Sequence, residues 1–384
     1  MKIVFFSNYL THHQIPFCLE MLKQEDVEFY FVSTEEMDEE RKRGGWSFSK
    51  EYPFEVKAYL SNCEKEKALR LAVESDVMII GSAPEEYVAY RMKNAKEKLT
   101  FRYSERIYKG GRWRVLSPRG FINRIRTYFR YWGKPLYMLC ASAYTAGDLA
   151  MLGSYIGKCF KWGYFPKTKH CEIDKLLEGK EEGSILWVAR MIDLKHPEIP
   201  IYVAKKLKDA GYQFKLTMIG VGPLLEPMQK LISDNELSDY VNLLGAMSPE
   251  EVRVHMDKSK ILLFTSDQHE GWGAVLNEAM NSGCVVVANS EIGSVPFLVK
   301  NGENGYIYRG NKAENIYDIV KDLIEETNKT AIVGKNAYCT IVNTWSESVA
   351  AERLVSTCKS LLKGCKSFFD EGPCSKAKIK VKKG

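Results

Sequence analysis

The segment from Thr265 to Ala288 reads TSDQHEGWGAVLNEAMNSGCVVVA. It holds two glutamates, Glu270 and Glu278, with a Gly-Trp-Gly turn between them. The apolar run KILLFTS that leads into it and the run CVVVANS that closes it both predict buried strands, and the residues between them predict a helix over 274–281. Strand, loop, helix and next strand form the repeating unit of a parallel sheet covered by helices.

The same alternation extends along the chain in both directions. It predicts further helices over 15–23, 197–211 and 346–362. A chain of 384 residues exceeds one ordinary core and is long enough for two domains. The runs that predict strands are KIVFFS (2–7), VEFYFVS (27–33), DVMIIGS (76–82), SILWVAR (184–190), FKLTMIG (214–220), YVNLLG (240–245), KILLFTS (260–266), CVVVANS (284–290) and GYIYRG (305–310).

The sequence therefore predicts an α/β protein with two doubly wound domains in tandem. We place the first domain at residues 1–170 and the second at 171–345, because the polar stretch 165–184 has the composition of a linker. A C-terminal helix over 346–364 is expected to pack back on the first domain. The basic residues 365–384 are expected to form a disordered tail.

Composition excludes several classes of protein. No apolar run is long enough to cross a bilayer, and the start MKIVFFSNYL lacks a signal-peptide cleavage site, so it is expected to be a strand. Ten cysteines without a CxxC pair predict reduced thiols and a cytoplasmic location. Six histidines without an HExxH-like pattern argue against a zinc enzyme.

Positive charge is concentrated in one segment. The net charge is +6, yet residues 102–134 alone hold ten Lys or Arg and a single acid, Glu105. Within it, RGFINRIRTYFRYWGKPLYML (119–139) mixes Arg with aromatic residues, as in a helix that lies on an anionic membrane surface. An ordinary helix with its aromatics in the core is the alternative. No nucleic-acid motif is present, so a nucleic-acid partner is not expected.

The loop after KILLFTS is a candidate binding site. Ligands of open parallel sheets bind beyond the carboxyl ends of the strands. Gly271 and Gly273 permit close approach to the backbone, and the first amides of the following helix have no internal acceptor, which suits a phosphate or a sugar hydroxyl. The carboxylate of Glu278 can accept two hydroxyl donors, as a ribose diol requires. From spacing alone, Glu278 can equally be a solvated helix residue.

These residues resemble the retaining glycosyltransferases of the GT4 family, which have the GT-B fold. The family's signature, E-G-[FW]-G-x-x-x-x-E-A-M, stands here as EGWGAVLNEAM from Glu270 to Met280. The following blocks correspond to NSGCVVVANS, with Cys284 and Val285 where Leu-Pro is usual, and to GSVPFLVKNGENGYIY. The resemblance covers residues 184–345 and is looser in the first domain. It implies two Rossmann-like domains facing a cleft, with the donor on the second.

A second motif agrees. The family carries an Arg and a Lys after the first strand of its second domain, and in WVARMIDLKHPE these are Arg190 and Lys195, with His196 where Gly is usual. Two cations offset the charge of a diphosphate through charge-assisted hydrogen bonds. A lone Arg or Lys is otherwise a solvated surface residue. The donor-binding residues that the resemblance implies are Arg190, Lys195, Gly222, Ala246, Met247, Gly271, Trp272, Gly273, Ala274, Val275 and Glu278.

The first domain supplies candidates for the acceptor side. Its opening, SNYLTHHQIPF, resembles a bacterial subgroup that acts on cell-surface polysaccharides and shares a His-His-Gln-x-Pro string. We predict a catalytic role for His13 together with Glu270, and acceptor contacts for His12 and Glu105. A histidine can titrate near neutral pH. The two histidines can instead cap the helix that begins near Ile15 or face solvent.

The resemblance implies a reaction that needs no protein nucleophile. A sugar moves from a nucleotide diphosphate to a hydroxyl of a glycan or lipid-linked acceptor with retention, and the leaving phosphate helps to deprotonate the acceptor. Glu270 would orient the sugar, Glu278 the ribose, and Arg190, Lys195 and the amides of 273–275 the diphosphate. No cofactor or metal is expected, because cations and a helix terminus carry the charge and no DxD triplet is present.

Two rival readings remain at this point. A non-catalytic nucleotide-sugar-binding or scaffold protein of a polysaccharide assembly would share the fold and the motifs. A dinucleotide-dependent oxidoreductase would share the doubly wound fold, but no G-x-G-x-x-G follows the first strand and GVGPLL is a poor match. The expected location is cytoplasmic, or peripheral on the inner face of the cell membrane.

Overall fold

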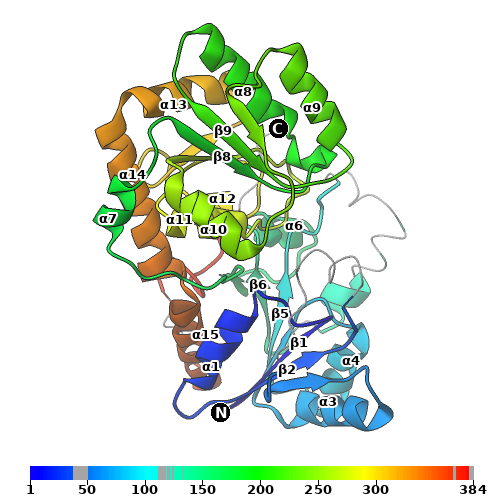
Figure 1. Ribbon diagram of the computed structural model, residues 1–384. Helices are drawn as coiled ribbons and strands as arrows, with labels where there is room; N and C mark the ends of the chain where they lie inside the picture. Colours follow the sequence, from blue (N-terminus) through cyan, green and yellow to red (C-terminus); the bar gives the residue numbers. More distant parts are fainter. Residues whose placement is uncertain are drawn as a thin grey trace. The chain divides into compact units, whose positions relative to one another are not determined.

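The protein, seen in a computed structural model, divides into two compact units (Figure 1). Unit 1 comprises Met1–Lys167 and Thr344–Gly384, and unit 2 comprises Thr168–Asn343. The chain thus leaves unit 1 once and returns to it, and each unit holds its own sheet. The residues that the structure describes are 1–37, 51–110, 118, 122, 125–131, 133–365 and 369–379.

The described part of unit 1 contains a seven-stranded sheet in which every pair of neighbouring strands is parallel. The strand order is β3-β2-β1-β4-β5-β6-β7, so the order reverses between β1 and β4. The predicted run KIVFFS forms the central strand. The strands are β1 (Lys2–Ser7), β2 (Glu28–Ser33), β3 (Glu55–Lys57), β4 (Val77–Ile80), β5 (Leu99–Ser104), β6 (Leu136–Cys140) and β7 (Cys159–Lys161).

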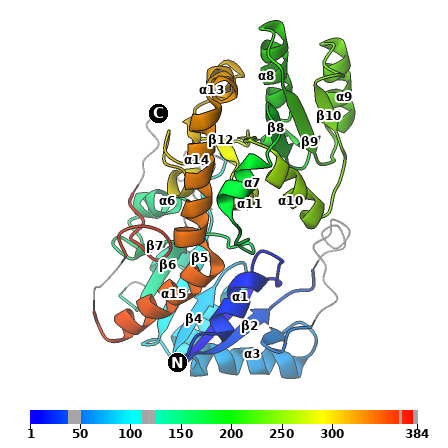
Figure 2. The same ribbon diagram turned by 60° about the vertical axis from the view of Figure 1, so that its left-hand side comes forward.

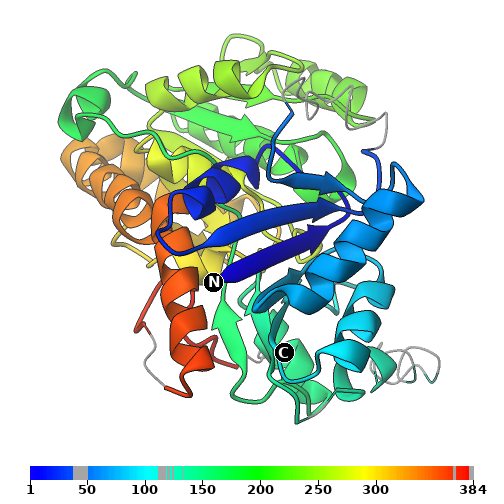
Figure 3. The same cartoon turned by 90° about the horizontal axis from the view of Figure 1, so that it is seen from below.

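Helices cover both faces of this sheet because alternate strand residues are apolar on both sides. Val4 and Phe6 join the core beneath α3 and α4, whereas Phe5 faces the opposite side and lies 5.3 Å from the ring of Phe31. In Figure 3, α1 and α15 lie on one side of the blue strands and the light-blue helices on the other. The helices are α1 (Ile15–Leu22), α3 (Asn62–Glu74), α4 (Glu85–Asn94), α6 (Thr145–Met151), α15 (Glu347–Leu362) and the π-helix η3 (Ile125–Phe129).

The C-terminal helix belongs to unit 1. α15 packs against α1, far from it in sequence (Figure 2). Trp345, just before α15, stacks on Phe165 with ring centroids 6.4 Å apart, and both rings are buried. Ser346 caps the helix by accepting a hydrogen bond from the amide of Val349. The last part of the chain therefore completes the first unit.

The expectation of a disordered tail is wrong for residues 369–379. Cys374 and Ser375 are fully buried. The amide of Lys161 in β7 donates to the Ser375 carbonyl at 2.7 Å, and the amide of Cys374 donates back to the Lys161 carbonyl at 2.8 Å. Backbone pairing with a strand fixes this stretch although its composition is basic. Residues 366–368 and 380–384 lie outside the described residues.

Part of the predicted helix over 119–139 is also wrong. Residues Leu136–Cys140 form strand β6, the sixth strand of the sheet. Gly133 has a φ of 82°, and Pro135 disfavours helical geometry in the residue before it, so a helix cannot run through this point. Most of the stretch 111–124 lies outside the described residues. None of the described helices combines the length and the low charge that a bilayer-crossing segment requires.

The described part of unit 2 contains a six-stranded parallel sheet with the order β10-β9-β8-β11-β12-β13. Each of its strands lies within a run that the sequence predicted. The prediction of two Rossmann-like α/β units is therefore confirmed. The strands are β8 (Ser184–Val188), β9 (Lys215–Ile219), β10 (Val241–Leu243), β11 (Ile261–Phe264), β12 (Val285–Asn289) and β13 (Tyr306–Tyr308).

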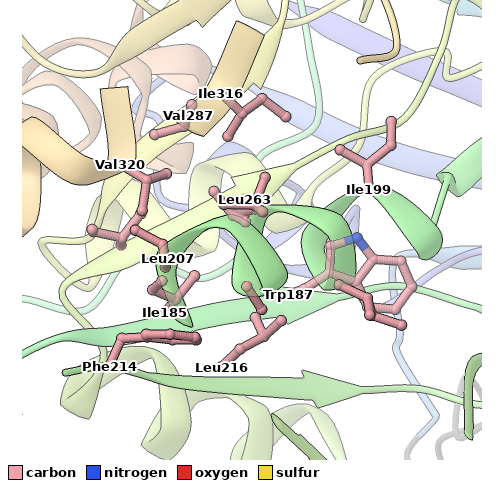
Figure 4. Packing of buried hydrophobic residues seen from close by; sticks show 14 of the residues in the cluster. Ile185, Trp187, Ile199, Leu207, Phe214, Leu216, Leu263, Val287, Ile316 and Val320 are labelled. Atoms are coloured by element: carbon pink, nitrogen blue, oxygen red, sulfur yellow. The ribbon is translucent and has the colours of Figure 1, made fainter. Parts of the chain in front are cut away.

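Two helical layers enclose the unit 2 sheet. α8, α9 and α13 cover the face formed by Ile185, Leu216 and Leu263 (Figure 4), and α10, α11 and α14 cover the other face. Trp187 is fully buried in the first layer. The helices are α7 (Ile173–Glu178), α8 (Glu198–Asp209), α9 (Leu225–Asp234), α10 (Pro249–Lys258), α11 (Val275–Asn281), α12 (Val295–Leu298), α13 (Glu314–Glu325), α14 (Thr327–Thr340), the 3-10 helix η4 (Asp193–Lys195) and the π-helix η5 (Ile341–Trp345).

We predict that Leu263→Ala destabilises unit 2 by about 2–5 kcal/mol, because it removes buried methyl groups at the centre of a packed layer. Hydrogen exchange of β8 and β9 amides in increasing urea measures the change within that unit. Ile332→Ala, on the exposed face of α14, is the matched control and should stay within about 0.5 kcal/mol. Equal losses in the two variants would contradict this view of the core.

Candidate functional site

The candidate site of unit 2 lies where the strand order reverses. The sheet runs β10-β9-β8 on one side and β11-β12-β13 on the other, so the reversal falls between β8 and β11. Ligands of doubly wound sheets bind in the crevice that such a reversal opens at the carboxyl ends of the strands. Arg190 and Lys195 follow β8, and Glu270 follows β11. The predicted residues therefore come from the two strands that flank the reversal.

Lys195 and Glu270 meet directly. The Nζ of Lys195 donates to Oε2 of Glu270 in an ion pair, and their side chains are only 15% and 14% exposed. Ser266 adds a hydrogen bond from its Oγ to the same carboxylate oxygen at 3.1 Å. A mostly buried pair is weakly screened by solvent, so each charge holds the other in place.

The loops that carry these two residues are tied together by Thr265. Its Oγ1 donates to the carbonyl of Lys195 at 2.7 Å and accepts from Nε1 of Trp187 at 2.9 Å. The amide of Asp267 donates to the Leu194 carbonyl at 3.0 Å. The β8 and β11 loops are thus one hydrogen-bonded unit, and their geometry does not depend on the ion pair alone.

The backbone conformation of His196 is one that favours glycine. Its φ of 49° and ψ of 58° lie in the left-handed region, where residues with a side chain are uncommon. The imidazole is held by two side chains. Its Nδ1 lies 3.0 Å from Oε1 of Glu198, and its Nε2 lies 3.1 Å from Nδ2 of Asn311. The hydrogen bond with Glu198 and the nearby charges of Glu198 and Asp267 raise the pKa of His196, although burial opposes them.

Arg190 is exposed, and the next residue, Met191, lies close to the backbone of the β9 loop. No hydrogen bond or ion pair joins its guanidinium to the residues that the structure describes. Gly222, in the loop after β9, has a φ of 156°, and a Cβ there would lie 2.4 Å from the Met191 carbonyl oxygen. Glycine is therefore required for the β9 loop to lie against the β8 loop. Gly222 acts on the candidate site by positioning the chain that carries Arg190.

The Gly-Trp-Gly turn is anchored from within. The side chain of Trp272 is buried, its Nε1 donates to Oδ1 of Asn277 at 2.8 Å, and its carbonyl accepts from Oγ of Ser294 at 2.5 Å. The ring of Trp272 therefore anchors the turn, and donor contact by this residue stays a prediction. Gly273 has a φ of 77°, and a Cβ there would lie 2.3 Å from the Phe264 ring.

Glu278 lies in the first turn of α11 and is half-buried. Burial raises the pKa of its carboxyl group to about 7, although the charge of Arg253 lowers it. Arg253 does not bond to this carboxyl group. Its Nη1 donates to the Glu278 backbone carbonyl at 2.9 Å, and its Nη2 donates to Oδ1 of Asn281 at 2.6 Å. Among the described residues nothing forms a hydrogen bond or ion pair with the carboxyl group of the half-buried Glu278.

The remaining predicted donor residues lie at the same edge of the sheet. Ala246 and Met247 lie after β10, with Ala246 exposed, and Ala274 is the residue before α11, which begins at Val275. Gly271 is buried with the turn. Within the described ranges, no group of three or more His, Cys, Asp or Glu side chains could hold a metal ion. The expectation that no metal is needed stays a prediction.

In unit 1, two of the three predicted acceptor-side residues line one pocket. The pocket measures about 570 Å³ and lies at the carboxyl ends of β1, β4 and β5, where the strand order of this sheet reverses. His13 and Glu105 line it. His12 is not among the lining residues; its ring centroid lies 3.7 Å from that of His13.

His13 does not titrate near neutral pH. Burial, and to a smaller extent the charge of His12, lower its pKa to about 3. Its ring stacks on Tyr164 with centroids 6.3 Å apart. His13 is therefore a neutral imidazole under physiological conditions, so the expectation of a titrating histidine is wrong here. A neutral ring still offers one hydrogen-bond donor and one acceptor.

Sequence reasoning misread the basic residues near this pocket. Arg102 is buried and forms a bidentate ion pair with Glu85, at 3.0 and 2.6 Å, and Arg106 is buried beside Asp148. These two cations cannot contact a membrane surface. Only the placement of Arg102 within a strand and of Arg106 just after it could have signalled burial, because strand residues of a central sheet face helices on both sides.

Residues 169–340 match the family described as Glycosyl transferases group 1, so this segment is a glycosyltransferase group 1 domain. Two curated relatives are similar over part of their length. The amylovoran biosynthesis glycosyltransferase AmsK of Erwinia amylovora is 28% identical over 46% of this chain and 44% of its own length. The putative colanic acid biosynthesis glycosyltransferase WcaL of Escherichia coli K12 is 27% identical over 46% of this chain and 45% of its own. The chain thus matches less than half the length of each.

A solved structure shows that the likeness in fold extends to both units. Alr3699/HepE of Anabaena, crystallised in complex with UDP, superposes with a TM-score of 0.67 over 94% of this chain and 100% of its own. The sequences are 15% identical, so the likeness concerns the fold. The predicted GT-B fold is therefore confirmed.

We predict that Glu278→Gln stabilises the unliganded protein at pH 8 by about 1–3 kcal/mol. The folded-state pKa of about 7 exceeds the ordinary value of 4.5, so stability falls as pH rises through this window, and the variant lacks that loss. The gain should shrink towards zero below pH 4.5. Thermal unfolding of both proteins from pH 4 to 8 measures it. Glu303→Gln, at an exposed loop position, should show no such pH-dependent gain.

Proposed function

Because residues 169–340 form a glycosyl transferases group 1 domain, we propose that the protein is a retaining glycosyltransferase of the GT4 type. It transfers a sugar from a nucleotide-diphosphate sugar to a hydroxyl group of a glycan or lipid-linked acceptor in cell-surface polysaccharide or glycolipid synthesis. The observation that carries this proposal is the ion pair between Lys195 and Glu270 at the strand-order reversal of the donor unit, with Arg190 exposed in the same β8 loop. The polysaccharide roles named for AmsK and WcaL support the pathway class.

The donor diphosphate binds at the cations that follow β8. Arg190 is exposed and ready to form charge-assisted hydrogen bonds, and Lys195 is held by Glu270 until the donor arrives. A diphosphate brings more negative charge than one carboxylate, so it competes for Lys195 and frees Glu270 to accept hydrogen bonds from the sugar hydroxyls. The amides of residues 273–275 add neutral donors at the same edge.

Glu278 binds the ribose of the nucleotide. Its carboxyl group is half-buried and has no hydrogen bond within the described chain, so a diol that enters gives it the partners it lacks. Since burial raises its pKa to about 7, hydrogen bonds from two hydroxyls favour the ionised form and draw that pKa down on binding. Ala246 and Met247 lie at the edge where the nucleobase extends.

The transfer step depends on positioning and charge stabilisation. The acceptor hydroxyl attacks the anomeric carbon on the face that the leaving phosphate departs from, the bond to the phosphate breaks, and the proton passes to a phosphate oxygen. His13 is neutral, so it orients the acceptor by hydrogen bonding and does not act as a charged acid. We propose a cytoplasmic enzyme that meets lipid-linked acceptors at the inner membrane face.

We predict that Glu278→Ala and the double variant Arg190→Ala/Lys195→Ala each weaken binding of the cognate nucleotide diphosphate at least about tenfold. Each lost charge-assisted hydrogen bond is worth about 1.5–3 kcal/mol, and 1.4 kcal/mol corresponds to tenfold. Thermal shift with UDP, GDP, ADP and dTDP identifies the cognate base, and calorimetry then gives the affinity.

Lys230→Ala, an exposed position on α9, is the matched control and should bind like the unaltered protein. Normal binding by the double variant would refute the phosphate clamp. A protein that binds the nucleotide sugar but neither hydrolyses nor transfers the sugar would be a binding or scaffold protein.

We further predict that EDTA leaves turnover unchanged within about twofold, since the cations and amides of the chain offset the diphosphate charge. Donor hydrolysis or transfer is measured before and after dialysis against EDTA. Loss of activity that magnesium restores would contradict the metal-free scheme.

A further inference from the structure

The unit 1 pocket contains a charged group that the proposed mechanism does not use. The pocket of about 570 Å³ is lined by the loop after β1, the ends of β4 and β5, and Tyr164 beyond β7. Arg106, two residues after β5, is among its lining residues. Because the strand order of unit 1 reverses between β1 and β4, this is the edge at which doubly wound sheets bind ligands.

Arg106 is buried, and some of its guanidinium donors lack a hydrogen-bond acceptor. Its side chain is 3% exposed, and within the described part of the chain its Nε and Nη1 atoms have no hydrogen-bond acceptor. The nearest carboxylate, that of Asp148, has Oδ2 3.8 Å from Nε, which is too far for a hydrogen bond. Buried guanidinium donors without acceptors are costly in the unliganded protein, and such exceptions call for a ligand.

The neighbours of Arg106 hold it in position without satisfying it. The ring of Tyr144 lies beneath the guanidinium, with its centroid 4.8 Å from Cζ. The Oδ2 atom of Asp148 already accepts from the amides of Ile107 at 3.2 Å and Tyr108 at 3.1 Å. Asp148 therefore supplies charge balance and fixes the backbone beside Arg106, and the Nε and Nη1 atoms of the guanidinium remain without an acceptor.

A second cation lines the same pocket. The Nζ of Lys109 lies 2.5 Å from Oε2 of Glu105, and the other oxygen of Glu105 accepts from the hydroxyl of Tyr164 at 2.5 Å. Both oxygens of Glu105 are thus occupied, and this carboxylate holds Lys109 at the pocket. The lining carries Arg106, Lys109 and the carboxylate of Glu105, while Asp148 balances Arg106 from outside the lining and His13 adds no charge.

We propose that this pocket is an anion-binding subsite for the acceptor, in which Arg106 and Lys109 together bind a carboxylate or phosphate group. The inference rests on the proposed function, since it names the chemical class of the acceptor. The planar guanidinium matches carboxylate and phosphate oxygens through two parallel hydrogen bonds, and Lys109 adds a point charge. Glu105 is then a positioning residue for Lys109.

Pairs of small ligands that differ in charge test the subsite in the full chain without a donor. Glucuronate is compared with glucose, and glycerol 1-phosphate with glycerol, by calorimetry. Hydrogen exchange of residues 104–110 locates the binding. We expect at least one anion to bind about tenfold or more tightly than its neutral counterpart, to protect that segment, and to weaken as salt rises. Preference for glucuronate assigns a uronic acid, and preference for the phosphate assigns a phosphorylated acceptor.

Variants then connect the preference to the two cations. Arg106→Gln and Lys109→Gln should each lower the affinity for the anion about tenfold, and Lys96→Gln, an exposed position outside the pocket, should not. Should Arg106→Gln fail to fold by circular dichroism, Arg106→Lys keeps the charge and removes the bidentate geometry, and should still weaken binding. Equal binding of charged and neutral ligands, or full binding by folded variants, overturns the proposal.

The outcome is separable from that of the proposed function. Nucleotide binding by unit 2 is measured on the same samples. Nucleotide binding without anion preference removes only the acceptor subsite, whereas anion preference without nucleotide binding removes the proposed transferase.

Discussion

The side-by-side pairing of β8 and β11 is the constraint on which the candidate donor site depends. Ile185 lies opposite Ile261 and Leu186 opposite Leu262, so the two strands end at the same edge although long stretches of chain separate them. The contacts between the β8 and β11 loops follow from this register, because loops that leave neighbouring parallel strands must share space. The buried layers of apolar side chains fix the register, since a shift by one residue would turn them towards the wrong face.

Each unit contains charged or polar residues whose burial, backbone angles or missing hydrogen bonds lower the stability of the unliganded protein. In unit 2, burial raises the pKa of the Glu278 carboxyl group and His196 adopts left-handed backbone angles. In unit 1, Arg106 retains buried donors without acceptors among the described residues. Groups of this kind concentrate where a protein binds ligands, because each gains more from a ligand than from the empty structure. The two sheets place these groups at equivalent edges, which is a consequence of their shared topology.

Continuous apolar runs made the central strands predictable, and the motif from Glu270 to Glu278 made the donor edge predictable. The rest depended on tertiary packing. Strand β6 was misread as helix because Arg and aromatic residues before Gly133 imitate an amphipathic pattern. The burial of the Trp272 ring as the anchor of its turn could not be read from the motif. The low pKa of His13 likewise comes from burial and from a neighbouring charge that only the fold brings together.

Strand β7 is the last in the order of the unit 1 sheet, so one of its sides faces no further strand of that order. Residues near Lys376 pair with it in antiparallel fashion, and the amine of Lys376 lies 4.2 Å from the centre of the Phe160 ring. This closing segment occupies hydrogen-bonding groups that would otherwise be a template for another chain. Proteolytic removal of this segment would leave the residues of both proposed binding sites in place. It would expose the unpaired backbone groups of β7, at which chains could aggregate.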